Sequence, residues 1–226
     1  AINYEAFEAA GALQYIDEET RTWTTDNFVK AMEAIRDAAA AGTIDVTVPG
    51  IIYCGAQGGD QGTRALVNNL YSGTIVGSDG KWNVGAEGVK ALELLKSMYD
   101  NKSMDAGFSM AAADELQQFQ QETCAMTFCW GTSNAMSYAS EDYTQISVPF
   151  PSDDGVPELE YLVNGFCVFD NGDDAKADAA KRFIAFICDD AEWGPKSVVQ
   201  TGAFPVRASF GNLYEGNDEM SLLSSW

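Results

Sequence analysis

One short apolar run ends in an aromatic side chain placed where it could bind a ligand. Residues 124–130 (CAMTFCW) have the length and apolarity of a strand buried on both faces, and they end in Trp130. Open α/β folds expose ligand-binding groups at such strand ends. An indole face can cover the C–H patch of a pyranose while neighbouring polar groups pair with its hydroxyls. Two interpretations of Trp130 stay open: a sugar-stacking group and a core residue.

A glycine-rich loop, residues 55–62 (GAQGGDQG), precedes a helix predicted at 63–71. The loop matches neither GxGxxG nor GxxxxGK[ST], and its one charged residue, Asp60, would repel phosphate. We therefore interpret it as a flexible or ligand-lining loop and not as a nucleotide site.

Catalytic chemistry lacks a recognisable pattern. The chain has no histidine, so a Ser or Cys nucleophile would depend on Lys or a carboxylate as its base. The acidic pairs, such as Asp114-Glu115 and Asp153-Asp154, are adjacent in sequence, and such neighbours do not face one another across a cleft. Residues 170–174 (DNGDD) have Gly at the third position, not the sixth that an EF-hand needs. We expect no enzyme activity, no catalytic residue, no metal and no cofactor.

Composition narrows the function further. The 226 residues include 13 Lys plus Arg and 34 Asp plus Glu, for a formal net charge of −21. This acidity excludes a basic footprint for nucleic acid or anionic membranes. No apolar run approaches the roughly 20 residues that span a bilayer. The 5 cysteines form no CxxC pair and have the pattern of small buried hydrophobes.

Strands and helices alternate along the chain, which predicts the α/β class. Apolar residues recur at helical spacing in residues 27–41, 86–100, 111–121 and 175–190, and a further helix is expected from Gly131 onward. In 175–190 the predicted buried stripe comprises Ala180, Phe183, Ile184 and Ile187. Extended segments are predicted at 43–53, 124–130, 144–150 and 161–169. The remaining tryptophans, Trp23, Trp82, Trp193 and Trp226, are interpreted as structural.

An ordered set of motifs resembles the extracellular solute-binding proteins of ABC sugar importers, the family of maltose-binding protein. Residues 2–11 (INYEAFEAAG) resemble the family's YNKDLFEEAG segment, and residues 22–28 resemble the TW helix start that follows it. Residues 80–99 are similar to the turn and helix before the site, and residues 119–126 match F-x-x-G-x-x-AM apart from its Gly. Further pieces follow in family order at residues 148–151, 164–166, 182–187 and 202–207.

The resemblance implies two α/β lobes of the type II periplasmic-binding-protein fold, which enclose a sugar by hinge closure. It covers the middle of that fold, so we expect a truncated form. Residues 1–157 would form mainly one lobe, similar to the C-terminal lobe. Residues 158–204 would be a crossover strand and helices of the other lobe, with an apolar face exposed where further strands are missing. Residues 205–226 would be an incomplete returning segment.

Site residues are carried over by position. The loop after the AM strand nominates Trp130, Gly131 and Thr132. The glycine-rich loop before the helix that contains Leu66 nominates Gln57, Asp60, Gln61 and Arg64. The crossover and the returning segment nominate Asn164, Phe166, Phe204 and Arg207.

The resemblance implies a sugar or oligosaccharide ligand, an ABC permease as the membrane partner, no nucleic-acid partner, and a monomer when complete. The location would be extracellular, either as a membrane-anchored lipoprotein or in the periplasm. Free cysteines are unusual in exported proteins and fit a reducing habitat. Two rivals stay open: a surface adhesion or peptide-binding module, and a carboxylate glycoside hydrolase.

Overall fold

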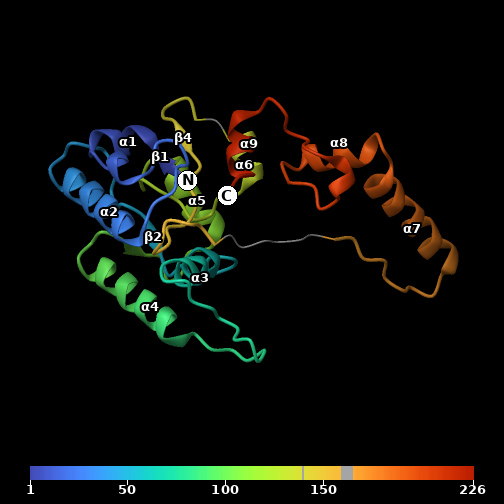
Figure 1. Cartoon of the computed structure of the whole chain (residues 1–226), viewed down its shortest axis with the longest axis horizontal. Coiled ribbons are helices and arrows are strands. Elements are labelled where there is room, and N and C mark those ends of the chain that lie inside the picture. Colours follow the sequence, from blue (N-terminus) through green and yellow to red (C-terminus); the bar gives the residue numbers. More distant parts are fainter. Residues whose placement is uncertain (139, 159–164) are drawn as a thin grey trace. The chain divides into compact units, whose positions relative to one another are not determined.

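The computed structural model describes residues 1–138, 140–158 and 165–226, which form two compact units (Figure 1). Unit 1 comprises residues 1–130, the described part of 139–160, and Trp226; unit 2 comprises residues 131–138 and the described part of 161–225. The regular elements of unit 1 are β1 (Ile2–Asn3), α1 (Tyr4–Ala9), the 3₁₀ turn η1 (Leu13–Tyr15), α2 (Thr25–Ala40), β2 (Ile51–Ile52), α3 (Asp60–Asn69), α4 (Gly85–Asp100), β3 (Asp105–Ala106), α5 (Ala112–Gln120) and β4 (Gln145–Ile146). Those of unit 2 are α6 (Thr132–Ser137), α7 (Asp174–Asp189), α8 (Trp193–Gln200), the 3₁₀ turn η2 (Ala208–Phe210) and α9 (Asp218–Leu223).

The predicted helices are confirmed to within a few residues. The structure of α2 shows why: Thr24 Oγ1 accepts a hydrogen bond from the Asn27 N–H at 3.2 Å and caps the helix. The predicted apolar stripe of α2 is buried, with Phe28 and Ile35 fully inaccessible to solvent. Trp23 packs edge-on against Phe28 with ring centroids 5.3 Å apart, and its indole N–H donates to Pro149 O at 2.8 Å. Trp23 is therefore structural, as predicted.

The predicted strands are much shorter in the structure. β1 pairs antiparallel with β4, and β2 pairs parallel with β3, each over two residues. Residues 124–130 form only isolated bridges, from Cys124 to Val48 and from Met126 to Ile2. Pro49 lies beside this segment and accepts from the Ala125 N–H, yet it has no N–H to return. A continuous ladder is therefore interrupted here, and the predicted strand is wrong in extent.

The other predicted extended segments are reduced in the same way. Of residues 43–53 only β2 is a strand, and of 144–150 only β4. Residues 165–169 have no regular structure, and residues 161–164 of that prediction lie outside the described residues.

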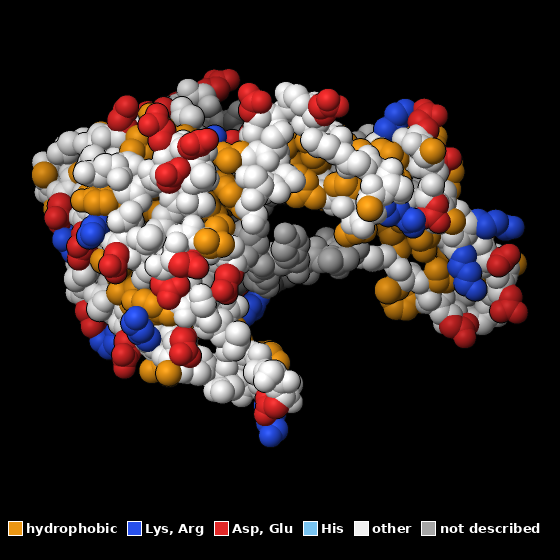
Figure 2. Space-filling view, viewed as in Figure 1, with side chains coloured by type: hydrophobic (Ala, Val, Ile, Leu, Met, Phe, Trp, Pro, Cys, Tyr) orange, Lys and Arg blue, Asp and Glu red, His pale blue; other side chains and the backbone are white. Residues whose placement is uncertain are grey.

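In unit 2 the predicted buried stripe of α7 is wrong. No residue of this helix is buried, and the side chains of Phe183 and Phe186 are 62% and 49% exposed. Hydrophobic side chains of α7 and α8 accordingly reach the molecular surface (Figure 2). α8 packs along one side of α7, where Phe186 meets Trp193 at a centroid distance of 6.4 Å. This contact covers the apolar stripe only in part, so its side chains stay partly exposed. The helical spacing was correct, but it does not say what covers the stripe.

Across the described residues, none of the helices combines the length and the apolarity needed to cross a membrane.

Candidate functional site

The glycine-rich loop of unit 1 is held against residues 107–112. The Ala56 N–H donates to Met110 O at 3.0 Å, and the Ala112 N–H donates to Gln57 O at 3.2 Å. A Cβ at Gly55 would lie 2.5 Å from Phe108 O, so only glycine allows this approach. Gly58 has a φ of +69°, which also favours glycine. The glycines therefore serve to fix the loop on its neighbours, while the Gln57 side chain stays exposed.

Predicted contact residues line the start of α3. The Asp60 carboxylate pairs with the Arg64 guanidinium at 2.5 Å, one helical turn away, and Gln61 between them is exposed. Asp60 also suits the positive end of the helix dipole. The Thr63 hydroxyl accepts a hydrogen bond from the Tyr53 N–H at 2.8 Å, which ties the helix to the strand before it. This turn presents a carboxylate, a guanidinium and an amide together.

Close packing joins α3 to the segment that carries Trp130. A Cβ at Gly62 would lie 2.5 Å from Phe128 Cβ, so the helix backbone lies directly against that side chain. Phe128 in turn stacks on Phe150, with ring centroids 5.9 Å apart. Residues 57–64, which include four nominated residues, and the residues that lead to the nominated Trp130 are thus neighbours in unit 1.

A buried carboxylate holds the backbone before Trp130. Glu115 of α5 is 5% exposed and accepts hydrogen bonds from the Thr127 hydroxyl at 2.8 Å and the Phe128 N–H at 2.7 Å. Burial raises the pKa of the Glu115 carboxyl above its usual range, and the two hydrogen bonds oppose that rise. Glu115 is a positioning residue that sequence analysis missed, because its acidic neighbour Asp114 made the pair resemble solvated surface.

Trp130 itself is half-buried and fixed. Its indole N–H donates to Ser147 Oγ at 3.0 Å, and its ring meets Phe119 edge-on at 6.0 Å. It lines a crevice of about 40 Å³ with Phe128 and Phe150. That volume accommodates water, not a sugar ring.

A larger pocket in unit 1 has a volume of about 410 Å³, within the range of small-molecule sites. Its lining includes Arg64 and Asn68 of α3, Ile75 and Trp82 of the following hairpin, and Glu158. Trp82 is 81% exposed, so its interpretation as a structural residue is wrong. The signal that could have found it is its place just after the Ser78-Asp79-Gly80 turn, where a side chain has little to pack against.

The remaining nominated residues that the structure describes belong to unit 2. Gly131 caps α6 and donates its N–H to Asn134 Oδ1 at 2.9 Å, and Thr132 is the first residue of α6. Phe166 is 64% exposed, Phe204 packs edge-on against Tyr214, and Arg207 pairs with Asp189. Asn164 lies outside the described residues.

Metal binding finds no support in residues 1–138, 140–158 and 165–226, where no three Cys, Asp or Glu side chains are grouped to hold an ion.

The described residues form small two-stranded sheets flanked by helices, and polar side chains are exposed on the glycine-rich loop and at the start of α3. The chain belongs to the bacterial extracellular solute-binding protein family, whose model matches residues 3–219. This match confirms the predicted family. Because the family is described as extracellular, the match also supports an extracellular location.

The fold is similar to that of the GacH receptor of Streptomyces glaucescens, for which structures are described unliganded and in complex with acarbose and an acarbose homolog. The two proteins are 15% identical with a TM-score of 0.59, and the match covers 98% of this chain and 54% of that receptor. The predicted α/β, periplasmic-binding-protein-like fold is thereby confirmed, and the chain spans about half the length of the receptor it matches. No curated protein has a significantly similar sequence.

Proposed function

We propose that this chain is part of a protein that binds a sugar or oligosaccharide and delivers it to an ABC transporter permease. The observation that carries the proposal is the packing of Gly62 on Phe128, which brings the segment with four nominated residues beside the residues that lead to Trp130. Family membership and the acarbose complexes of the similar GacH receptor support a saccharide as the ligand.

Each group has a role in this proposal. Trp130 would stack only through the part of its half-buried indole that is exposed, and the Asp60–Arg64 pair offers an acceptor and a donor for adjacent hydroxyls. Gln57 and Gln61 add exposed amides, which can both donate and accept. The nominated residues of unit 2 and the crossover are proposed as ligand contacts on their own: Gly131, Thr132, Asn164, Phe166, Phe204 and Arg207.

The proposal extends to the whole protein. Residues 1–157 would belong mainly to one lobe, and residues 158–204 to a lobe completed by further polypeptide, which would cover the exposed apolar face of α7. The complete protein would act as a monomer without catalysis, either periplasmic or anchored by lipid.

A tryptophan-fluorescence titration against mono- and oligosaccharides tests the proposal. We expect a saturable change with at least one saccharide in the Trp82→Phe background, which removes the exposed indole of the larger pocket. Adding Trp130→Ala should abolish that change, and adding Trp193→Ala, which removes an exposed indole of unit 2, should leave it. Because Trp130 is packed against Phe119, circular dichroism must show that the variant is folded. A saturable change that Trp130→Ala leaves intact would remove Trp130 from the site. A silent panel, or release of reducing sugar, would contradict the proposed function.

A further inference from the structure

We propose that the 410 Å³ pocket of unit 1 is an accessory site for a pyranose ring, stacked on Trp82. The ligand class rests on the proposed function, but the site does not: apart from Arg64 and its partner Asp60, none of the residues that form the pocket was nominated for ligand contact. Trp130 does not line this pocket, so the two sites can be tested separately.

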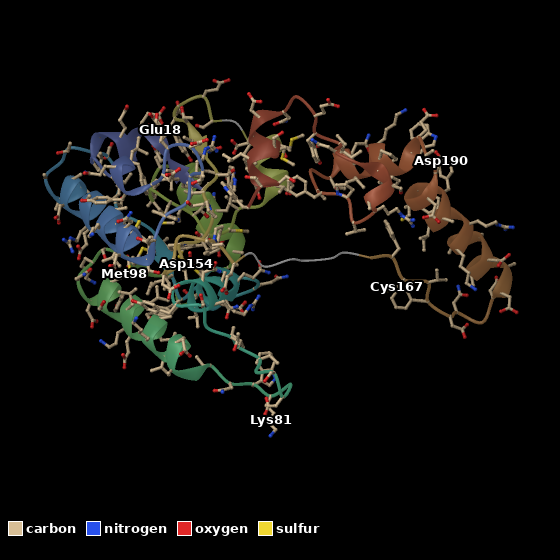
Figure 3. The ribbon with its side chains drawn as sticks, in the orientation of Figure 1. Glu18, Lys81, Met98, Asp154, Cys167 and Asp190 are labelled. Carbon is tan, nitrogen blue, oxygen red and sulfur yellow. The ribbon has the colours of Figure 1, made fainter. Side chains whose placement is uncertain are left out.

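The indole is presented by an ordered hairpin. Val76 and Trp82 face each other as an antiparallel bridge, and the turn between them is closed by hydrogen bonds from the Gly77 N–H to Lys81 O and from the Gly80 N–H to Gly77 O, each 2.9 Å. Lys81, labelled in Figure 3, marks this turn. At the hairpin's root, Gly73 is buried and lies against α4, where a Cβ would meet Gly88 N at 3.2 Å.

This hairpin exposes several apolar side chains to solvent. Trp82, Val76 and Val84 are 81%, 48% and 40% exposed, so an apolar surface faces solvent beside a pocket. Single exposed apolar residues are ordinary, but a tryptophan that lines a concave site is a favoured stacking platform. A pyranose carries its C–H bonds on one flat face, which matches an exposed indole.

The opposite wall is polar. Arg64 and Asn68 lie one turn apart on the same side of α3, so both line the pocket. The Asn68 Oδ1 atom is buried without a hydrogen-bond partner among the described residues, which leaves an acceptor that a ligand hydroxyl or a water beside it would satisfy. The Glu158 N–H donates to Asn69 Oδ1 at 2.9 Å, and this bond fixes Glu158 at the pocket edge.

The charges around the pocket disfavour an anionic ligand. The Arg64 guanidinium is already paired with Asp60, and the Glu158 carboxylate adds negative charge, so an anion is disfavoured. A sugar hydroxyl both donates and accepts, and so can use the guanidinium, the amide and the carboxylate together.

The experiment is a titration of the ¹⁵N-labelled chain followed through its indole N–H signals, one for each tryptophan. Trp82→Phe and Trp130→Phe identify the two reporters, and Trp193→Phe is the matched control. The probes are maltotriose, cellotriose and xylotriose, with sorbitol as a polyol that has hydroxyls but no ring face. We expect at least one trisaccharide to shift the Trp82 signal saturably and sorbitol to leave it unmoved. Asn68→Ala should weaken that binding by about tenfold.

The outcomes separate the two proposals. A saturable shift at Trp82 supports the accessory site, whether or not Trp130 responds. A shift at Trp130 alone overturns the accessory site and supports the main one. Equal shifts with sorbitol, or none with any trisaccharide at Trp82, also overturn the accessory site. Because Trp82 is 81% exposed, Trp82→Ala should retain the fold. A trisaccharide that shifts the Asn68 side-chain N–H signals of the wild type but not those of Trp82→Ala would therefore report lost contact and not unfolding.

Discussion

Gly62 lies against Phe128 so closely that a Cβ on the glycine would come within 2.5 Å of the phenylalanine Cβ. This contact sets the distance between the start of α3 and the segment that leads to Trp130. The phenylalanine is also stacked on Phe150, so it has little freedom to retreat. The contact brings together two segments that are far apart in the sequence.

Substitution of Gly62 tests this packing. Alanine normally stabilises a helix interior by about 1 kcal/mol relative to glycine. Here the added methyl must displace Phe128, and overpacking of this kind costs about 1–3 kcal/mol. We expect Gly62→Ala to lower the free energy of unfolding by about 1 kcal/mol in urea denaturation. Gly165→Ala, whose methyl would meet nothing within 4 Å, is the control. Equal behaviour of the two variants would contradict the contact.

Glu115 should make stability depend on pH. Its carboxyl pKa is raised in the folded protein, so its contribution is fully present below the unfolded value of about 4.3 and is lost as the pH rises through the folded value. Glu115→Gln cannot ionise. We expect the glutamine variant to gain stability over wild type between pH 4 and pH 7 in urea unfolding. A gap of the same size at both pH values would refute the buried ionisation.

Removal of the Glu115 side chain should have the opposite effect. Glu115→Ala leaves the Thr127 hydroxyl and the Phe128 N–H without their acceptor. Each buried unsatisfied group costs about 1–3 kcal/mol. We therefore expect Glu115→Ala to be clearly less stable than both wild type and Glu115→Gln at pH 7, as measured by thermal unfolding. An alanine variant as stable as the glutamine variant would show that these hydrogen bonds contribute little.

The cysteines should differ in reactivity. Burial raises the pKa of the Cys54 thiol to about 11 and that of Cys124 to about 12, whereas Cys167 is exposed. Only the thiolate reacts with alkylating reagents. At pH 8 we expect iodoacetamide to modify Cys167 first, and to modify Cys54 and Cys124 only after denaturation, as mapped by peptide mass spectrometry. Early modification of Cys124 would contradict its burial.

Phe28 and Phe183 both belong to apolar stripes predicted from helical periodicity, but they should contribute differently to the free energy of unfolding. Phe28 is fully buried in unit 1, and truncation of such a side chain costs about 3–5 kcal/mol. Phe183 of unit 2 is 62% exposed, so Phe183→Ala should change the free energy of unfolding by less than about 0.5 kcal/mol. Urea titrations followed by circular dichroism compare the two. A large loss in Phe183→Ala would show that another surface covers α7.

Helices were more predictable from the sequence than strands or sites. Helical periodicity is local, and in α2 the Thr24 cap and the Phe28 stripe agree with it. The strand at 124–130 depended on partners far away in sequence, one of which is Pro49, and a local pattern cannot show that. The exposure of Phe183 has the same cause, because spacing identifies an apolar side but not what covers it.

The candidate site was predictable only in part. Asp60 and Arg64 share a turn of α3, as their spacing of four indicates. The approach of Gly62 to Phe128 is a tertiary contact between separate segments and leaves no mark in either one. Glu115 resembled surface because its burial comes from α5 packing on residues 127 and 128.

Calorimetric titration with saccharides tests the central claim, that the surface joined at Gly62 and Phe128 binds a sugar. Gln61 is exposed on the first turn of α3, and Gln117 is exposed on α5 and is not among the nominated residues, which makes them a matched pair. We expect heat of binding from at least one oligosaccharide, weakened about tenfold by Gln61→Ala and unchanged by Gln117→Ala. Binding that both variants retain in full, or no binding of any saccharide by the folded wild-type chain, would contradict the account.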